Sequence, residues 1–192
     1  AINILEKNNK IIGVELSNIG KIKSKAVILT TGTFLNGKIY FGNESQEAGR
    51  IGNTSSKVLA KFINKKFKTM RLKTGTPPRI YAKSINYDVL EPQLSENNGI
   101  FLSYFTKQNT NKKINCFITK TNNKTHKIIR DNLDRSAMYS GIIKSQGVRY
   151  CPSIEDKITK FGDRNGHNIF LEPEGLNSEL VYPNGISNSL DK

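Results

Sequence analysis

The residue type best suited to covalent chemistry occurs at Cys151. Pro152 and Ser153 can begin a helix directly after it, and Arg149 precedes it closely. A thiol at a helix N-terminus beside a cation has its thiolate stabilised by the helix dipole and by the neighbouring charge. The pattern is therefore compatible with a nucleophile at Cys151. The alternative is inert packing, because cysteine is among the most frequently buried residue types, and the local spacing alone favours that alternative.

The remaining candidate side chains carry weaker signals. Cys116 lies in a strand pattern and is predicted to serve packing only. The spacing of the two cysteines fits no zinc site, and without a secretory signal we expect free thiols and no disulfide. His126 and His167 are too few and too isolated for a metal cluster. Either histidine could act as a general acid or base, but a capping or surface position is the favoured interpretation.

Two glycine-containing segments allow a phosphate or a flavin to approach the backbone closely. They are residues 31–33 (TGT) and 49–52 (GRIG). Each is a weak signal alone, because glycine-rich turns are common. The chain contains no complete G-x-G-x-x-G, so these residues by themselves identify no dinucleotide site.

The elements expected in the first part of the chain are those of an α/β protein. Residues 2–5 and 11–16 predict two strands of a small β-meander with turns at 7–10 and 18–20. The apolar run 26–30 is typical of a strand covered on both faces of a parallel sheet, with a ligand at its carboxyl end. Thr54 or Ser55 can cap a helix that ends before Lys68. Its predicted apolar face consists of Val58, Leu59, Phe62 and Ile63.

A domain boundary is expected in the loop 74–79, where Pro77 and Pro78 forbid regular structure. Beyond it, residues 107–113 are polar and predicted to be mobile, and strands are predicted over 116–119, 141–150 and 169–171. Thr125 can cap a helix that reaches Leu133. We therefore expect this part to be mixed α/β and largely β.

The composition bounds the class of protein. Of the 192 residues, 36% are hydrophobic, which is enough for a sizeable buried core. No apolar run approaches the roughly eighteen residues of a membrane span. The formal charge of +14 suits a polyanionic partner such as nucleic acid, although lysine scattered among asparagine and isoleucine is also the bias of an AT-rich genome. The first residue is not Met, so we expect a fragment that lacks its true start.

Five strings are far more specific together than their parts. In chain order they are 30–39 (TTGTFLNGKI), 71–79 (RLKTGTPPR), 132–136 (NLDRS), 149–157 (RYCPSIEDK) and 170–175 (FLEPEG). In this order they closely resemble the tRNA uridine 5-carboxymethylaminomethyl modification enzyme family, also called MnmG or GidA. The resemblance covers essentially the whole chain and corresponds to roughly the middle third of such a protein.

The resemblance implies a function and its cofactors. Members are implied to use FAD, NADH and a methylene from methylenetetrahydrofolate to build a (carboxymethyl)aminomethyl-type group on C5 of the wobble uridine of tRNA. It further implies a tRNA-modification GTPase partner of the MnmE type, a homodimer within a heterotetramer, no membrane, and the cytoplasm or the mitochondrial matrix as location.

The resemblance also implies site residues. Cys151 matches one of two cysteines considered catalytic, the other lying upstream. Ala1 and Ser56 match FAD contacts. The segment matching the NAD site consists of Gly147, Val148, Arg149, Tyr150, Cys151, Pro152, Ser153, Ile154, Glu155, Asp156, Lys157, Ile158, Thr159, Lys160 and Phe161. Basic residues would neutralise tRNA phosphates, with surface solvation favoured for any single one of Arg79, Arg130, Arg135 and Arg149.

The expected domain organisation follows from these implications. Residues 1–73 would be the C-terminal part of a Rossmann-like FAD-binding domain, with a β-meander, a sheet strand and a helix. Residues 74–192 would be an inserted, largely β domain associated with NAD and tRNA. Two alternatives remain, a folate- and FAD-dependent tRNA uridine methyltransferase and a non-catalytic RNA-binding remnant.

Overall fold

The computed structural model describes residues 1–96, 99–108, 112–147 and 152–191. The chain divides into two compact units. One consists of Ala1–Leu72 together with Asp191, and the other consists of Lys73–Leu190. The fold is mixed α/β and consists largely of strands, as the sequence predicts.

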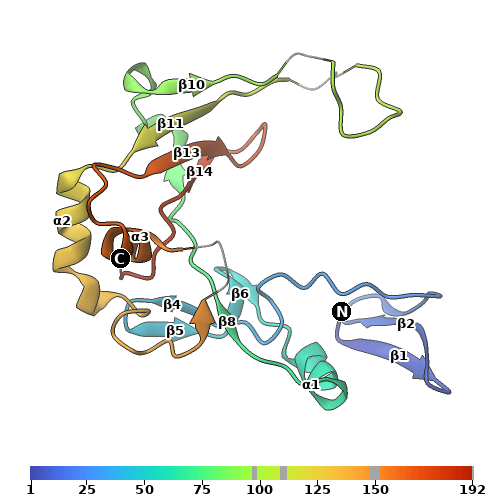
Figure 1. Ribbon diagram of the computed structural model, residues 1–192. Helices are drawn as coiled ribbons and strands as arrows, with labels where there is room; N and C mark the ends of the chain where they lie inside the picture. Colours follow the sequence, from blue (N-terminus) through green and yellow to red (C-terminus); the bar gives the residue numbers. More distant parts are fainter. Residues whose placement is uncertain (97–98, 109–111, 148–151, 192) are drawn as a thin grey trace. The chain divides into compact units, whose positions relative to one another are not determined.

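The first unit opens with a three-stranded antiparallel sheet. Its strands β1 (Asn3–Lys7), β2 (Lys10–Leu16) and β3 (Gly20–Lys23) pair in chain order, and Figure 1 shows β1 beside β2. Asn8 and Asn9 make the first turn with φ of 50° and 58°. Two consecutive positive φ angles define the type I′ turn, whose twist suits a hairpin, and asparagine tolerates them. The predicted meander is therefore confirmed.

The strand predicted over residues 26–30 is absent. This stretch has no regular structure, and Ile28 and Leu29 are 85% and 45% exposed. A strand of a parallel sheet needs neighbouring strands for its backbone hydrogen bonds. Among the described residues no strand pairs with this stretch, so its apolar pattern is not used to build a sheet.

The rest of the first unit contains two small ladders and one helix. The ladders pair β4 (Ile39–Phe41) with β5 (Glu44–Gln46), and β6 (Ala48–Arg50) with β7 (Asn53–Thr54). The helix α1 (Lys57–Lys66) ends before Lys68, as predicted, but its N-cap is Ser56 and neither Thr54 nor Ser55.

The apolar face of α1 differs from the predicted face at one position. Leu59, Ala60 and Ile63 are buried, and Leu59 and Ile63 form a cluster with Ile4 of β1. Val58 is 60% exposed. Because each residue advances about 100° around a helix, a buried stripe centred on Leu59 and Ile63 turns Val58 toward solvent.

The second unit is built on a five-stranded antiparallel sheet. The strand order is β10-β11-β13-β14-β9. Their bounds are β9 (Ile80–Tyr81), β10 (Glu91–Gln93), β11 (Cys116–Lys120), β13 (Asn168–Pro173) and β14 (Leu180–Asn184). The strands predicted over 116–119 and 169–171 are thus present. Ile169, Leu171 and Val181 form the buried cluster on the sheet, since alternate residues of a strand share a face.

Two helices of the second unit pack on each other. They are α2 (Asn123–Asp131) and α3 (Ile154–Lys160), and Figure 1 shows both beside the sheet. Ile129 of α2 and Ile154 and Ile158 of α3 form their shared core. The N-cap of α2 is Asn122, whose side chain accepts a hydrogen bond from the Thr125 backbone amide at 3.0 Å. Thr125 is therefore a first-turn residue and is not the predicted cap.

Short elements complete this unit. Among its described residues they are the 3-10 helices η1 (Ala82–Ser84), η2 (Tyr87–Val89) and η3 (Leu133–Arg135) and the strand β12 (Gln146–Gly147). The two-residue strand β8 (Leu72–Lys73) includes the last residue of the first unit and the first residue of the second. The predicted strand 141–150 is wrong over 141–145. Gly141 has φ of 82°, and the Ile143 amide bonds to the Ala137 carbonyl at 3.0 Å, so this backbone turns. Residues 148–150 lie outside the described residues.

Candidate functional site

The predicted nucleophile, Cys151, lies outside the described residues, as do Val148, Arg149 and Tyr150. The helix expected after it is present and begins at Ile154. Ser153 is its N-cap, and the Ser153 hydroxyl oxygen accepts a hydrogen bond from the Asp156 backbone amide at 3.2 Å. Glu155 and Asp156 occupy the first turn, where the positive end of the helix dipole interacts favourably with acidic side chains.

The segment 147–161 separates into buried and accessible members. Ser153, Ile154, Glu155 and Ile158 are buried, while Asp156 and Lys157 are half-buried. A ligand bound to this segment would instead meet its exposed members, which are Gly147, Pro152, Thr159, Lys160 and Phe161.

Glu155 is a buried carboxyl group that joins α3 to two other segments. Its side chain is fully buried, and its Oε1 accepts hydrogen bonds from the Ser189 amide at 2.8 Å and from the Ser136 hydroxyl at 3.0 Å. The two serine hydroxyls are themselves 2.8 Å apart. The Lys157 ammonium donates to the Gly185 carbonyl at 2.8 Å. These bonds fix α3 to residues 185–189, so the acidic and basic residues of this motif hold its position.

The outward side of α3 carries a polar network around Tyr139. The Tyr139 hydroxyl lies 2.7 Å from the Thr159 hydroxyl and 3.2 Å from Asp156 Oδ1, and Lys160 pairs with Asp156 at 2.8 Å. Burial alone would raise the pKa of Asp156, but the hydrogen bond and charge of Lys160 outweigh it and lower that pKa. The pKa of Tyr139 is raised, chiefly by burial and also by the Asp156 charge.

The two histidines form a buried pair, which corrects the expectation of isolated capping or surface residues. His126 and His167 are 1% and 7% exposed, and their ring centroids lie 5.5 Å apart. Thr121 links them, because its hydroxyl lies 2.7 Å from His126 Nε2 and accepts from the His167 amide at 2.9 Å. Burial, His126 and the cations Lys157 and Arg164 lower the pKa of His167. The pairing joins the end of β11 to the start of β13, and nothing local in the sequence could have indicated it.

The first unit positions Ser56 through a compact backbone network. The Ser56 amide donates to the Phe34 carbonyl at 2.8 Å, and the Thr33 hydroxyl donates to the Gly49 carbonyl at 2.7 Å. A Cβ at Gly49 would lie 2.3 Å from the Phe34 ring. Gly49 therefore serves the packing of the loop 31–37, which accounts for a glycine here without any ligand.

The Ser55 hydroxyl donates to the Phe34 carbonyl at 3.3 Å, whereas the Ser56 hydroxyl forms no hydrogen bond within the described part of the chain. Although Ser56 is the N-cap of α1, its side chain makes no capping hydrogen bond. Ser56 is half-buried at the start of a ten-residue helix whose first turn contains no acidic residue. The Lys57 amide bonds to the Ser55 carbonyl at 3.0 Å, while the Ser56 hydroxyl caps no amide of the first turn. Ala1, the other implied FAD contact, is exposed.

Three of the four arginines considered as phosphate contacts are described, and each is bonded within the protein. Arg79 forms an ion pair with Glu174, and its guanidinium lies 4.5 Å from the centre of the Tyr182 ring. Arg130 donates to the Gly162 carbonyl at 3.3 Å, and Arg135 donates to Asn132 Oδ1 at 2.9 Å. Arg149 lies outside the described residues. Arg79 in particular ties the loop before β9 to the hairpin between β13 and β14.

The remaining side chains capable of site chemistry add little. Cys116 is a free, half-buried thiol in β11, in keeping with a packing role. In the described part of the chain, no group of three or more histidine, cysteine and acidic side chains could hold a metal ion. Nor does that part contain a helix long and apolar enough to cross a bilayer.

The fold and the motifs together define a two-unit, strand-rich α/β chain whose helix α3 is capped by Ser153 of the motif 149–157. The model of the glucose inhibited division protein A family matches residues 1–192, so the chain belongs to that family.

Two solved structures of GidA from Aquifex aeolicus resemble the chain over nearly its full length. The form I crystal structure is 45% identical, with a TM-score of 0.79, and the match covers 99% of this chain and 33% of that one. The form II crystal structure is 41% identical, with a TM-score of 0.77 and coverages of 99% and 30%. The chain thus spans about a third of the length of these structures.

Proposed function

We propose that this chain is part of a flavin-dependent enzyme that modifies C5 of the wobble uridine in tRNA. The observation that carries the proposal is the family match over residues 1–192, together with identities of 41–45% over 99% of the chain. The proposed product is a (carboxymethyl)aminomethyl-type group, with methylenetetrahydrofolate as the one-carbon donor and a GTPase as partner.

A flavin contact at Ser56 is supported by the unpaired hydroxyl at the N-terminus of α1. Helix N-termini favour anions, and the absence of acidic residues in the first turn leaves that preference available to a diphosphate. Ser56 would donate to FAD, and the loop 31–37 would hold Ser56 through the bond to the Phe34 carbonyl. When bound, FAD supplies hydride transfer.

A nicotinamide dinucleotide contact along 147–161 is supported only by the accessible members of that segment. Phe161 is 51% exposed and can present its ring, and Lys160 and Thr159 offer polar groups beside it. Ile154, Glu155 and Ile158 would hold α3 in place and would not touch NADH, because they are buried.

Cys151 is the proposed nucleophile toward the uracil ring. C5 of uracil is a poor nucleophile until a thiolate adds to C6, which converts the ring to an enolate. The C5 carbon of this enolate attacks the methylene electrophile. Loss of the C5 proton and departure of the thiolate then restore the ring. A cysteine with a lowered pKa is what this sequence of steps requires.

The test replaces Cys151 with serine in the full-length gene product. Cys151→Ser keeps the side-chain size and removes the thiolate, so we expect loss of wobble-uridine modification with unchanged flavin absorbance. Modified nucleoside is measured in tRNA from complemented cells by liquid chromatography and mass spectrometry. Cys116→Ser is the matched control and should retain modification. Wild-type modification by Cys151→Ser would refute the role of Cys151, whereas unmodified tRNA in wild-type cells would refute the proposed function itself.

A further inference from the structure

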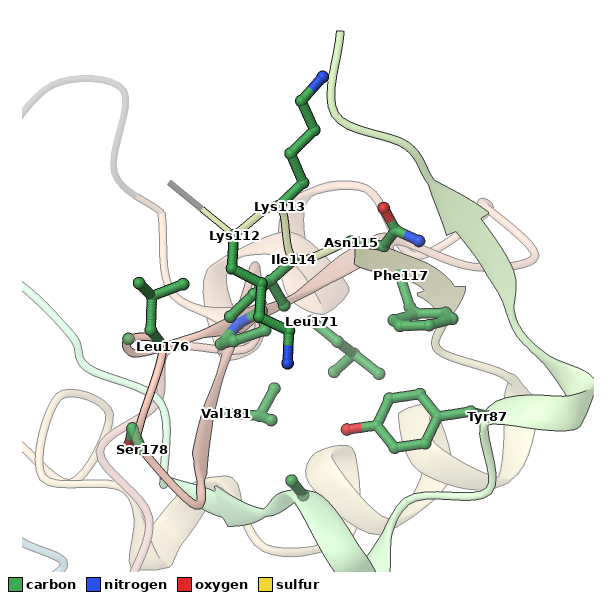
Figure 2. Close-up of a pocket in the computed structure, with 13 residues that line it drawn as sticks. Tyr87, Lys112, Lys113, Ile114, Asn115, Phe117, Leu171, Leu176, Ser178 and Val181 are labelled. Atoms are coloured by element: carbon green, nitrogen blue, oxygen red, sulfur yellow. The ribbon is translucent and has the colours of Figure 1, made fainter. Parts of the chain in front are cut away.

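The second unit contains a mostly apolar pocket that none of the described residues of 147–161 lines. Its volume is about 440 Å³, within the range of small-ligand sites. Leu171 and Val181 form its floor, and Tyr87 and Phe117 form one wall with ring centroids 4.7 Å apart and planes at 55° (Figure 2). Pro173 and Gly175 also line it, so the motif 170–175 builds part of the pocket.

Two polar groups point into this pocket without partners. Figure 2 shows the Lys112 ammonium and the Tyr87 hydroxyl directed into the cavity, whereas Lys113 extends away from it. Neither of the first two groups forms a hydrogen bond or ion pair within the described ranges. The Lys113 ammonium instead donates to the Glu96 carbonyl at 3.3 Å. A ligand that suits the pocket therefore combines an apolar, planar body with an anion for Lys112 and a polar edge for Tyr87.

We propose that this pocket receives one unstacked base of an RNA chain, with the adjoining phosphate bound by Lys112. The inference rests on the proposed function, because it names a contact for the RNA substrate of that enzyme. Single-stranded bases stack on aromatic side chains, and the base edges hydrogen-bond to nearby polar groups. Tyr87 and Phe117 supply the rings, and the Tyr87 hydroxyl supplies the polar group.

Two further features favour RNA as the occupant. The chain carries a net charge of +14, which attracts a polyanion and not an uncharged apolar ligand. The connection between β10 and β11, which carries Lys112, also exposes Tyr104 and Phe105 at 105% and 94%. Exposed aromatic rings among lysines are the pattern of a single-strand stacking surface.

The test measures binding of a fluorescein-labelled, unstructured oligouridylate by fluorescence anisotropy at several salt concentrations. Lys112→Ala should weaken binding about ten-fold and reduce the slope of log K against log salt by about 0.7, the value for one phosphate on a single strand. Lys113→Ala is the matched control, because it removes the same charge from the adjacent residue, whose ammonium points away from the cavity, and it should change affinity by less than about three-fold.

The wall of the pocket is tested by Tyr87→Leu and Tyr87→Phe. Loss of a stacking ring should weaken binding about ten-fold in Tyr87→Leu, while Tyr87→Phe keeps the ring and should retain most of the affinity. Circular dichroism checks that each variant is folded. If Tyr87→Leu does not fold, photocrosslinking of wild-type protein to 4-thiouridine oligonucleotide decides, with the adduct expected on Tyr87 or Phe117.

The proposal is overturned if Lys112→Ala and Lys113→Ala weaken oligonucleotide binding equally, or if the crosslink maps elsewhere. It is also overturned if NADH occupies the pocket and the oligonucleotide does not. These outcomes are distinct from failure of the proposed function. If the protein binds RNA through this pocket but leaves the wobble uridine unmodified, the RNA-binding pocket is supported and the proposed enzymatic function is refuted.

Discussion

The buried carboxyl group of Glu155 provides a quantitative test of how α3 is held. In Glu155→Ala the Ser189 amide loses the Oε1 acceptor that lies 2.8 Å away. The Ser136 hydroxyl also loses its bond, but it can turn to the Ser189 hydroxyl, which lies 2.8 Å from it. Ser136 and Ser189 are 0% and 7% exposed, so water cannot easily replace the lost acceptor.

The expected cost follows from these contacts. A buried amide left without an acceptor costs roughly 1–3 kcal/mol. The lost burial of the Glu155 methylene adds about 0.8 kcal/mol. The Oε2 atom of Glu155 has no partner among the described residues, and its removal returns roughly 1 kcal/mol. We therefore expect Glu155→Ala to lower the free energy of unfolding by about 2 kcal/mol.

Urea titration followed by far-ultraviolet circular dichroism measures this loss, since the chain has seven tyrosines but no tryptophan for fluorescence. With a slope near 2 kcal/mol per molar urea, the midpoint should fall by about 1 M. Glu155→Gln keeps an oxygen acceptor and should cost less than about 1 kcal/mol. The exposed Glu179→Ala should change stability by less than about 0.5 kcal/mol. A midpoint for Glu155→Ala equal to that of Glu179→Ala would refute the reasoning.

Two further predictions test other parts of the fold. The pKa of His167 lies below its ordinary value of 6.5, chiefly because the ring is buried, so below that pH the unfolded chain binds more protons than the folded one. The free energy of unfolding should therefore decline as pH falls from 6.5 toward the lowered pKa and stay constant above 6.5. Urea titrations across this range measure the decline, which His167→Asn should abolish; an equal decline in that variant would contradict the assignment. Gly49→Ala places a Cβ 2.3 Å from the Phe34 ring and should cost roughly 1–3 kcal/mol, against less than about 0.5 kcal/mol for Gly175→Ala, where no atom lies within 4 Å. Thermal melts measure the stability of both variants, and equal melting temperatures would contradict the close packing of Gly49 against the Phe34 ring.

Sequence reasoning succeeds here where the determining interactions are local. The turn at Asn8 and Asn9 fixes the hairpin of β1 and β2, and the spacing of Leu59 and Ile63 fixes the buried side of α1. Both depend on residues a few positions apart. The N-caps are less certain because several neighbouring polar residues can compete, as Asn122 does with Thr125 at the start of α2.

Sequence reasoning fails where a residue's role depends on a distant segment. The run 26–30 has the composition of a buried strand, but composition cannot supply the neighbours that would pair with it. His126 and His167 meet because antiparallel β11 and β13 bring Thr121 and the residue before β13 together. The site residues carried over by resemblance, Cys151 above all, remain predictions, since the chemistry of a thiol depends on neighbours that its own motif does not contain.

The unpaired run 26–30 also affects how the chain behaves in solution. Ile28 and Leu29 are exposed, and their backbone amides and carbonyls take part in no ladder. An exposed apolar segment whose backbone groups are in no ladder can pair with a strand of another molecule. The chain purified by itself should therefore self-associate as its concentration rises, and Ile28→Lys should improve its solubility by placing a charge on this segment.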